Sequence, residues 1–299
     1  MNRKLYHIAD ERDDGKKLSE ILKYRFGVSE MLLRRMKRLE NGILLNGKSV
    51  YTIDRAYVGD SIEVIIEPEE KGSDNVVPTE GKLDIRFENE DILVVNKPAD
   101  IAVHPSHGHY LTSLGNIVMW YYTSQGERFV FRPINRLDRG VSGVMAVAKN
   151  AYSHTFAAKL LHSGDFFREY LAITEGEISE NEGEIIAPIG RRDGSVIERE
   201  VRDDGDYAKT EFEVVERKNG MTLLKVRPIT GRTHQIRVHM AHIGHPLVGD
   251  FLYGKEHPDL PNRCALHSHR LHMKLPFEQG VADVSCELPD ELKKVFNKE

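Results

Sequence analysis

The chain has 299 residues, of which 40% are hydrophobic and 30% are charged, and its formal net charge is −5. This size and composition are typical of a globular protein with a sizeable core, and the apolar runs are shorter than the roughly 18 residues of a membrane-spanning helix. The first residues lack the apolar stretch of a secretory signal and the chain has two cysteines, so we expect a cytoplasmic protein with reduced thiols.

The N-terminal residues predict two short helices. Apolar side chains recur at helical spacing from Leu18 to Phe26, and Gly27 follows as a helix stop. Ser29 is a good N-cap, and we expect a second helix over residues 30–39. This helix is rich in arginine and therefore predicts a phosphate-binding surface formed by Arg34, Arg35 and Arg38.

Two strands complete this N-terminal region. Residues 43–47 read as a strand that enters a tight Asn-Gly turn, and residues 61–66 read as another strand. Helix, basic helix, hairpin and strand in this order resemble the small RNA-binding domain named after ribosomal protein S-four, over residues 15–66. The resemblance implies an RNA-binding domain over residues 1–67. The alternative is a small α+β domain with an ordinary solvated basic face.

An acidic, turn-rich stretch, residues 68–81, predicts a linker to a second domain that spans residues 82–299. In the second domain we expect helices from Asn150 to Leu161 and from Arg232 to Ile243. Short apolar runs predict strands over residues 92–96, 143–148, 170–175, 210–216, 223–227, 265–273 and 281–286. Strands with few helices and no regular alternation favour an α+β domain with a mixed, mostly antiparallel sheet.

One acid in the second domain has an unusual setting. Asp138 lies between Arg136 and Arg139, and a turn of small residues and the apolar run 143–148 follow it. A strand there would hold Asp138 on an exposed but rigid loop. Two flanking guanidinium groups keep such a carboxylate ionised and can also bind phosphates. This suits a nucleophile or base that acts on a nucleic acid, although by itself the pattern is more typical of a surface ion pair.

A second segment changes that balance. Residues 228–254 read PITGRTHQIRVHMAHIGHPLVGDFLYG. Together the two segments resemble the RluA/RluD-type pseudouridine synthases, whose patterns are HRLDxxTSG and GRxHQIRxHxxxxGHPxxGDxxYG. Residues 96–105 and 168–172 are similar to the family's KPxGxxVHP and KxYxA, and the blocks occur in the family's order. The resemblance covers residues 84–288 and implies the pseudouridine synthase fold, with an active-site cleft that crosses the sheet.

The resemblance also implies roles for individual residues. Asp138 matches the catalytic acid, Arg237 its ionic partner, and Tyr170 the aromatic residue that stacks on the detached uracil. It remains open whether the acid attacks the sugar carbon or acts as a base in an elimination. The isomerisation requires no cofactor and no metal. We expect substrate contacts from Arg136, Arg139, Arg232, His234 and Gln235.

The chain departs from the family pattern at several places near Asp138. Asn135 stands where His is usual, and Gly140 and Val141 replace a polar residue and Thr. Asp100 stands where Gly is common, and Arg168 replaces Lys. None of these changes removes a group required for chemistry, but they alter local hydrogen bonding and therefore bear on RNA preference.

Two other functions fit parts of the pattern. A non-catalytic RNA-binding or ribosome-assembly factor could share the fold, although binding alone does not require Asp138, Tyr170 and Arg237 together. A metal-dependent hydrolase could use the crowded histidines His234, His239, His242 and His245, although HExxH is absent and neither cysteine joins them. We expect a monomer that acts on RNA, without a membrane partner. Ribosomal RNA is favoured over transfer RNA because an appended RNA-binding domain suits a large structured substrate.

Overall fold

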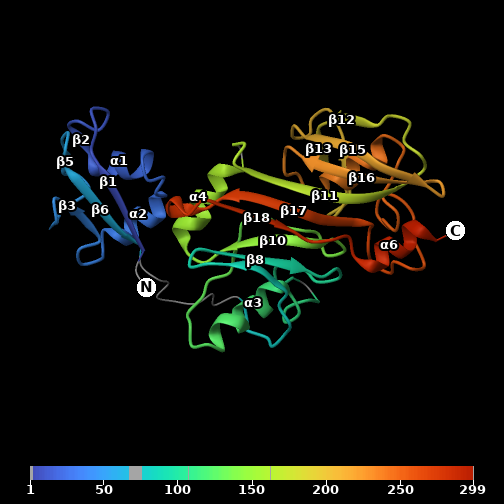
Figure 1. Cartoon of the computed structure of the whole chain (residues 1–299), viewed down its shortest axis with the longest axis horizontal. Helices are drawn as coiled ribbons and strands as arrows, with labels where there is room; N and C mark the ends of the chain where they lie inside the picture. Colours follow the sequence, from blue (N-terminus) through green and yellow to red (C-terminus); the bar gives the residue numbers. More distant parts are fainter. Residues whose placement is uncertain (1–2, 67–75, 107, 162, 299) are drawn as a thin grey trace.

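The chain forms a small N-terminal unit beside a larger body that is built on one long sheet (Figure 1). The computed structural model describes residues 3–66, 76–106, 108–161 and 163–298. The N-terminal unit has a four-stranded antiparallel sheet in the order β1-β6-β3-β4, and its helices pack on that sheet. Its elements are β1 (Arg3–Ile8), β2 (Lys16–Lys17), α1 (Leu18–Tyr24), α2 (Glu30–Met36), β3 (Ile43–Leu45), β4 (Lys48–Ser49), β5 (Arg55–Ala56) and β6 (Ser61–Ile66).

Three local predictions are confirmed in this unit. Gly27 follows the first helix with a φ of +70°, a conformation that a side chain would disfavour. The hydroxyl of Ser29 accepts a hydrogen bond from the Leu32 N–H at 3.2 Å and so caps α2. Asn46 and Gly47 both have positive φ, as a two-residue hairpin turn between β3 and β4 requires.

The second helix is shorter than predicted, because α2 ends at Met36 and not at Leu39. The Arg38 N–H donates to the Arg35 carbonyl, and the Leu39 N–H donates to the Met36 carbonyl. The last turn therefore closes over three residues instead of four, which tightens it. As a result, Arg38 lies on an exposed turn beyond the helix.

The larger body is built on a ten-stranded sheet whose main path is β12-β15-β16-β11-β17-β10-β8-β7. Strand β18 pairs with β17, and β9 pairs with β10. Among these strands only β10 and β17 pair in parallel, at Ser142 and Gly143, so the sheet is mixed and mostly antiparallel, as predicted. The strands are β7 (Ile85–Glu88), β8 (Ile92–Lys97), β9 (Arg132–Pro133), β10 (Ser142–Ala148), β11 (Phe166–Glu175), β12 (Glu182–Ile186), β15 (Lys209–Lys218), β16 (Met221–Pro228), β17 (Leu266–Lys274) and β18 (Val281–Ser285).

Helices and one separate hairpin accompany this sheet. They are α3 (Leu114–Thr123), α4 (Ala151–Leu160), the hairpin of β13 (Ile189–Arg191) and β14 (Arg199–Val201), α5 (Gln235–His242), the short 3-10 helix η1 (Pro276–Glu278) and α6 (Asp290–Asn297). Asn150 caps α4 as predicted, by accepting from the Ser153 N–H. Helix α5 begins at Gln235 rather than Arg232, because His234 has left-handed backbone angles that a right-handed helix excludes. No helix of the described ranges is long and apolar enough to cross a membrane.

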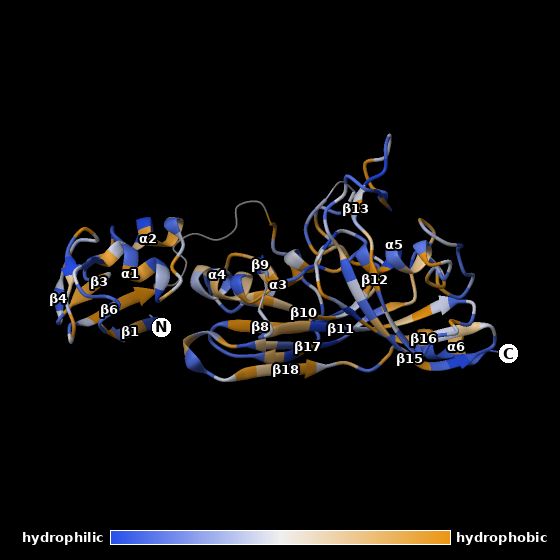
Figure 2. Ribbon diagram, turned by 90° about the horizontal axis from the view of Figure 1, so that it is seen from above, coloured by the Kyte–Doolittle hydropathy of each residue, from blue (hydrophilic) through white to orange (hydrophobic). Residues whose placement is uncertain are grey.

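The core lies on both faces of the central strands. Figure 2 shows β8 and β10 largely in the hydrophobic colour, and β10 is buried along its whole length. Leu93 and Val95 pack in one hydrophobic cluster with residues of α3 and α5, whereas Ile92 and Val94 pack in another with residues of α4. This alternation explains why β8 reads as a continuous apolar run. Strand β10 is buried on both faces as well, so it is a rigid base for the loop that precedes it.

The N-terminal unit is joined to the larger body through α4 and β1. Tyr152 of α4 is buried in the hydrophobic cluster of the N-terminal unit. Arg3 of β1 donates to the buried carboxylate of Asp91 at 2.6 Å and also pairs with Glu90. Its guanidinium carbon lies 4.4 Å from the ring centre of Phe277. The two parts therefore share apolar side chains and a buried ion pair.

Most of the predicted linker, residues 68–75, lies outside the described residues. Its remaining part lies against α3: the side-chain amide of Asn116 donates to the Val77 carbonyl at 2.7 Å, and Val76 packs in the same cluster as Val118. These residues are therefore attached to the larger body.

Candidate active site

Asp138 lies on the loop between β9 and β10, and several bonds fix the shape of this loop. The Val141 N–H donates to the Asp138 carbonyl at 3.1 Å. The ammonium of the buried Lys97 donates to the carbonyls of Pro98, Ile101 and Arg139, at 2.8, 2.9 and 3.3 Å. The loop is thereby tied to the end of β8, and the Asp138 side chain remains 30% exposed.

Asn135 and Asp100, two departures from the family pattern, both have structural functions. The buried side-chain oxygen of Asn135 accepts from the Ala146 N–H at 2.9 Å and so attaches the loop to β10. Asp100 has a φ of +64°, which explains why glycine is common at this place in the pattern. Its carboxylate pairs with Arg139, whose Nη1 also lies 2.8 Å from Nε2 of His109.

Arg237 connects Asp138 to a second acid, Asp250. One guanidinium nitrogen, Nη1, donates to Oδ2 of Asp138 at 3.1 Å. The other two, Nε and Nη2, donate to the two oxygens of Asp250, each at 2.7 Å. Burial opposes the charged form of Arg237, but the bonds to Asp250 outweigh it and hold the pKa of Arg237 above its usual range. The pairing of Arg237 with Asp138 is the geometry that the resemblance implied.

Asp250 is a residue that the sequence analysis missed. It is fully buried, and its Oδ1 also accepts from the backbone N–H groups of Leu252 and Tyr253, at 3.1 and 3.3 Å. The bidentate bond with Asp250 fixes the plane of the guanidinium and so directs the third nitrogen at Asp138. The only signal in the sequence was its position within the GDxxYG part of the second signature.

Tyr170 forms a wall of the site at an irregular point in the sheet. Strand β11 pairs Glu169 with Arg270 and Tyr170 with Ser268, so His269 of β17 is skipped and the sheet bulges. A bulge redirects the side chains beside it. Only 6% of Tyr170 is exposed, and burial raises the pKa of its phenol, which is therefore protonated at neutral pH.

These residues line one cleft of about 850 Å³, a size typical of small-molecule sites. Eight of the eleven predicted site residues are on its wall: Arg136, Asp138, Arg139, Tyr170, Arg232, His234, Gln235 and Arg237. Among the described residues that line it, Asp138 is the only acid, whereas five are arginines. Two further ionisable side chains on the wall, His104 and Arg168, had no predicted role. The cleft therefore suits an anionic ligand that also presents an aromatic surface.

The predicted substrate contacts differ in how available they are. Arg136 is exposed, and the described residues give its side chain no hydrogen bond or ion pair. Arg232 is also exposed, but its Nε donates to the Tyr207 carbonyl at 3.0 Å and its Nη1 lies 3.4 Å from Asp206. His234 is nearly buried, with Nε2 at 3.7 Å from Oδ2 of Asp138.

Gln235 has a different environment from the one expected of a substrate contact. Its buried amide nitrogen donates to the Lys209 carbonyl and the Thr210 hydroxyl, at 2.9 and 3.0 Å. Its amide oxygen accepts from the Thr230 hydroxyl and the Arg232 N–H, at 2.6 and 3.0 Å. All the hydrogen-bonding capacity of an amide side chain is thus used within the protein. We therefore assign Gln235 to the shape of the turn before α5 rather than to substrate binding.

Two of the crowded histidines also use ring nitrogens in hydrogen bonds within the protein. His239 is fully buried, with Nδ1 at 2.9 Å from the Thr210 hydroxyl and Nε2 at 2.9 Å from the Ala187 carbonyl. His245 is bound through Nδ1 to the Glu175 carbonyl at 3.0 Å. Within the described ranges, no three His, Cys, Asp or Glu side chains are grouped as a metal ion would need. With both nitrogens engaged, His239 has no lone pair directed at a metal.

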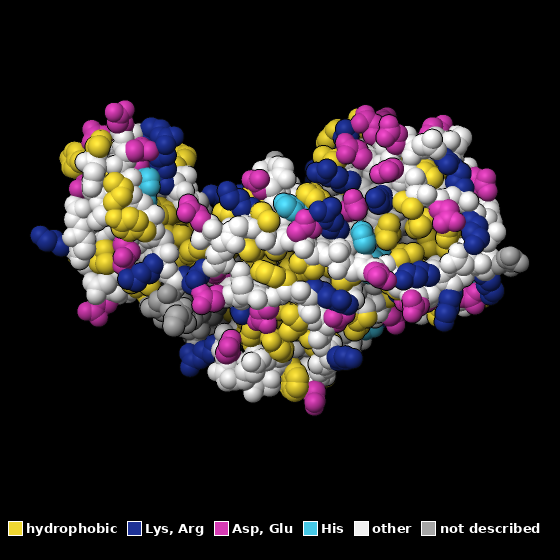
Figure 3. Space-filling model, viewed as in Figure 1, with side chains coloured by type: hydrophobic (Ala, Val, Ile, Leu, Met, Phe, Trp, Pro, Cys, Tyr) yellow, Lys and Arg dark blue, Asp and Glu magenta, His cyan; other side chains and the backbone are white. Residues whose placement is uncertain are grey.

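The three remaining predicted residues lie on the N-terminal unit, outside the cleft. Arg34 and Arg38 are exposed, and Arg35 is half-buried. Arg34 is 4.0 Å from Glu30, one helical turn earlier. On the face drawn in Figure 3, basic and histidine side chains lie along the concave edge between the N-terminal unit and the far end of the sheet, with acidic side chains among them. That arrangement is suited to a long polyanion.

Known proteins are similar to this chain in sequence and in fold. The family model for RNA pseudouridylate synthase matches residues 91–242. Two uncharacterized RNA pseudouridine synthases of Bacillus subtilis, YjbO and YhcT, are 36% and 34% identical, over 91% and 96% of this chain and 96% and 95% of their own lengths. Ribosomal large subunit pseudouridine synthase D of Yersinia pestis is 32% identical over 87% of this chain and 83% of its own length. The structure of human RNA pseudouridylate synthase domain containing 1 superposes with a TM-score of 0.58 at 27% identity, covering 73% of this chain and 86% of the human one.

Proposed function

The chain belongs to the RNA pseudouridylate synthase family and is a pseudouridine synthase of the RluA/RluD type, and from this premise we propose that Asp138, Arg237 and Tyr170 carry out the isomerisation. The reaction breaks the bond from ribose C1′ to uracil N1, turns the base and joins C1′ to C5. The proton that leaves C5 is balanced by the one that N1 gains, so neither an oxidant nor a cofactor is consumed. One observation carries the proposal: a carboxylate fixed by a rigid guanidinium in an otherwise cationic cleft with an aromatic wall.

Asp138 acts at the sugar. Its Oδ2 is held by Arg237, and its side chain is exposed enough to reach a nucleotide in the cleft. An ionised carboxylate can either attack C1′ or remove a proton from the neighbouring carbon, and the same placement serves both routes. Arg237 fixes the position of this carboxylate through the bond from Nη1.

Tyr170 holds the detached uracil. Its phenol stays neutral at physiological pH, because burial raises its pKa. A neutral aromatic ring on the wall of the cleft gives the base a flat surface on which it can turn without leaving. The phenolic O–H is also available to assist the proton transfer from C5.

The arginines of the cleft take up the backbone of the extruded nucleotide. Extruding a base from its stack costs a few kcal/mol, and contacts with the flanking phosphates offset that cost. We assign this function to Arg136, Arg139 and Arg232, and Arg136 is the best placed because it has no competing partner in the described residues.

The RNA is bound by two parts of the chain. We assign residues 1–67 to an S-four-like RNA-binding domain that acts through Arg34, Arg35 and Arg38, residues 68–81 to the linker and residues 82–299 to catalysis. The N-terminal order of helix, basic helix and hairpin supports the first assignment. We propose ribosomal RNA as the substrate of a cytoplasmic, monomeric enzyme, because a relative is named for the large ribosomal subunit.

Mapping of pseudouridines in total RNA, from cells with and without this gene, identifies the target. We expect specific uridines of ribosomal RNA to lose the modification when the gene is absent and to regain it with the wild-type gene. Loss confined to transfer RNA would replace the proposed substrate class.

The Asp138→Asn variant tests the assigned chemistry. We expect no measurable pseudouridine from it, while RNA binding stays within several-fold of the wild type because arginines provide most of the affinity. An Asn variant that forms product at a comparable rate would refute the assignment of Asp138. A wild-type protein that binds RNA but isomerises no uridine would favour the RNA-binding factor instead.

A further inference from the structure

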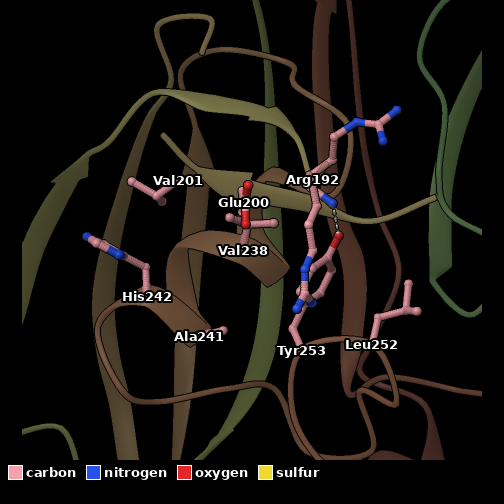
Figure 4. A pocket seen from close by; sticks show the side chains of 9 residues that line it. Arg192, Glu200, Val201, Val238, Ala241, His242, Leu252 and Tyr253 are labelled. Atoms are coloured by element: carbon pink, nitrogen blue, oxygen red, sulfur yellow. Dashed lines mark hydrogen bonds between the residues drawn. The ribbon is translucent and has the colours of Figure 1, made fainter. Parts of the chain in front are cut away.

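Tyr253, in the turn that follows α5, connects the candidate active site to the β13–β14 hairpin. Its hydroxyl oxygen lies 2.9 Å from the backbone nitrogen of Arg199 and 2.7 Å from Nδ1 of His234. Tyr253 lies beside a cavity of about 370 Å³, which Glu200 and Val201 of the hairpin also line (Figure 4). The Tyr253 ring also lies 5.1 Å from the guanidinium carbon of Arg237 and packs edge-on against the His234 ring. Tyr253 thus contacts both Arg237 and His234, the two residues whose nitrogen atoms approach the carboxylate of Asp138.

The position of one proton follows from these bonds. A backbone N–H can only donate, so the Tyr253 oxygen accepts from Arg199. Within the described residues, the single phenolic proton has an acceptor only if it is directed at Nδ1 of His234, which then accepts it. A protonated imidazole would donate from both nitrogens and leave that phenolic proton without an acceptor in the described residues.

The surroundings of both groups favour these protonation states. Burial raises the pKa of Tyr253, so the phenol keeps its proton. Burial also lowers the pKa of His234, more than the neighbouring Asp138 raises it, so the imidazole is neutral at physiological pH. A neutral imidazole that accepts at Nδ1 carries its proton on Nε2.

We propose that Tyr253 is a positioning residue that fixes the tautomer of His234, so that His234 presents its Nε2–H to the carboxylate of Asp138. Nε2 is 3.7 Å from Oδ2, which is beyond hydrogen-bond length, so the N–H acts on the carboxylate as an oriented dipole. The other tautomer would direct a lone pair at the same anionic oxygen. Oδ2 therefore faces both Arg237 and His234, and Oδ1 is left as the reacting oxygen. This inference rests on the proposed chemistry of Asp138.

The tautomer can be measured directly in the intact protein with ¹⁵N-labelled histidine. We expect the NMR spectrum of His234 to show a protonated Nε2 and an unprotonated Nδ1 at neutral pH. Tyr253→Phe should give a mixture of tautomers and lower kcat by roughly tenfold, the equivalent of one hydrogen bond, while KM for RNA stays within about twofold. Tyr121→Phe is the matched control, since it removes a tyrosine hydroxyl bonded to Glu88 outside the cleft, and it should change neither quantity.

Two substitutions at His234 separate the functions of its two nitrogens. The amide nitrogen of Gln can reach the place of Nε2, whereas that of Asn reaches only the place of Nδ1. His234→Gln should therefore retain more activity than His234→Asn, although Asn is the better residue for the left-handed backbone at this position. A higher rate for the Asn variant, or an Nδ1–H tautomer in the wild type, would overturn the inference. Absence of uridine isomerisation by the wild type would instead overturn the proposed function, and the NMR result would still decide the tautomer.

Discussion

Arg237 lies between two acids in different surroundings: Asp250 is fully buried and bound at two points, whereas Asp138 is partly exposed and bound at one. At the scale of single residues, this asymmetry fits a supporting function for Asp250 and the proposed reaction of Asp138. The buried pair determines where the guanidinium lies, and Asp138 stays partly exposed. A lysine in place of Arg237 would supply the charge but could not serve both acids with fixed geometry.

The Asp250→Asn variant tests this separation. We expect kcat to fall by about 10²-fold while RNA affinity stays within a few-fold, because Asp138 loses its fixed partner but the surface arginines remain. Single-turnover rates and binding curves measure the two effects. Asp206→Asn is the control, since it removes a carboxylate from the exposed pair with Arg232. Thermal melting must show a folded Asn variant, because loss of one partner of a buried pair costs about 3–5 kcal/mol. A folded variant with the wild-type rate would contradict the supporting function of Asp250.

His267 gives the protein a defined sensitivity to acid. Its ring is buried, with Nδ1 at 2.8 Å from the Ser142 hydroxyl, and burial lowers its pKa from 6.5 to about 4. The unfolded chain binds the proton below pH 6.5, whereas the folded protein does so only near pH 4. The contribution of neutral His267 to the free energy of unfolding is therefore fully present above pH 6.5 and is lost as the pH decreases from 6.5 to 4.

The His267→Asn variant should lack this part of the pH dependence. A shift of this size corresponds to a stability change on the order of 3 kcal/mol across the window. Denaturant unfolding of the wild type and the variant at several pH values measures this change. The difference between the two proteins separates the contribution of His267 from those of the other buried histidines. Equal pH slopes in the two proteins would show that folding does not change the proton affinity of His267.

At the scale of elements, the β10–β17 junction depends on one glycine. Gly143 has a φ of +118°, and a Cβ atom there would lie 2.2 Å from the Ser268 carbonyl oxygen. The two strands approach this closely where they pair in parallel. Because β17 lies between β11 and β10 on the main path of the sheet, the junction determines how the walls of the cleft meet.

Gly143→Ala should therefore destabilise the fold by about 2–4 kcal/mol, from the clash and from the strained backbone. Gly164→Ala is the control, since no atom lies within 4 Å of its added Cβ and its φ is not in the left-handed region. Denaturant unfolding compares the two variants. Similar free energies of unfolding would show that the strands can separate without loss.

Elements with a local physical signal were predicted well, and those decided by distant contacts were not. Strong caps and turns located α4 and the β3–β4 hairpin, and two-sided burial made β10 easy to see. The start of α5 was wrong because the left-handed conformation of His234 leaves no mark in the apolar periodicity. Helix α3 was not predicted, since its end is rich in aromatic residues typical of strands, although Ser113 and Asn116 form a capping box at its start.

The candidate site shows the same division. Asp138, Tyr170 and Arg237 come from separate segments, and only the resemblance brought them together before the structure did. Asp250 and Tyr253 were not predicted, because an acid and a tyrosine in a turn are ordinary until their partners are known. Gln235 was misassigned for the same reason, since its amide looks available until Thr210 and Thr230 are placed beside it.

At the scale of the whole molecule, charge is distributed so that an acidic protein can bind RNA. The net charge of −5 conceals a cationic cleft and a basic helix on the N-terminal unit. Phosphate binding depends on such local surfaces more than on the sum. Binding should therefore weaken steeply with salt, with a log–log slope of about −0.7 for each phosphate neutralised in single-stranded RNA.

Replacing Arg34, Arg35 and Arg38 together with glutamine should flatten that slope and leave the rate at saturating RNA unchanged. Replacing Lys293, Lys294 and Lys298, on α6 and just beyond it, changes the charge equally at the opposite end of the molecule and should leave the slope as it was. Filter binding across a salt series measures both. An unaltered slope in the arginine variant would exclude α2 and its following turn as an RNA surface.

The place of β17 in the sheet also sets an order of events during synthesis. Asp138 precedes β10 on one side of β17, and Tyr170 lies in β11 on the other, so the two cannot face one cleft before residues 266–274 have left the ribosome. A growing chain can bury its N-terminal unit and form hairpins early, but the halves of its sheet stay unjoined until then. Ribosomes carry the RNA that this enzyme is proposed to modify, so we expect a nascent chain that still lacks β17 to be inactive on the ribosome that synthesises it.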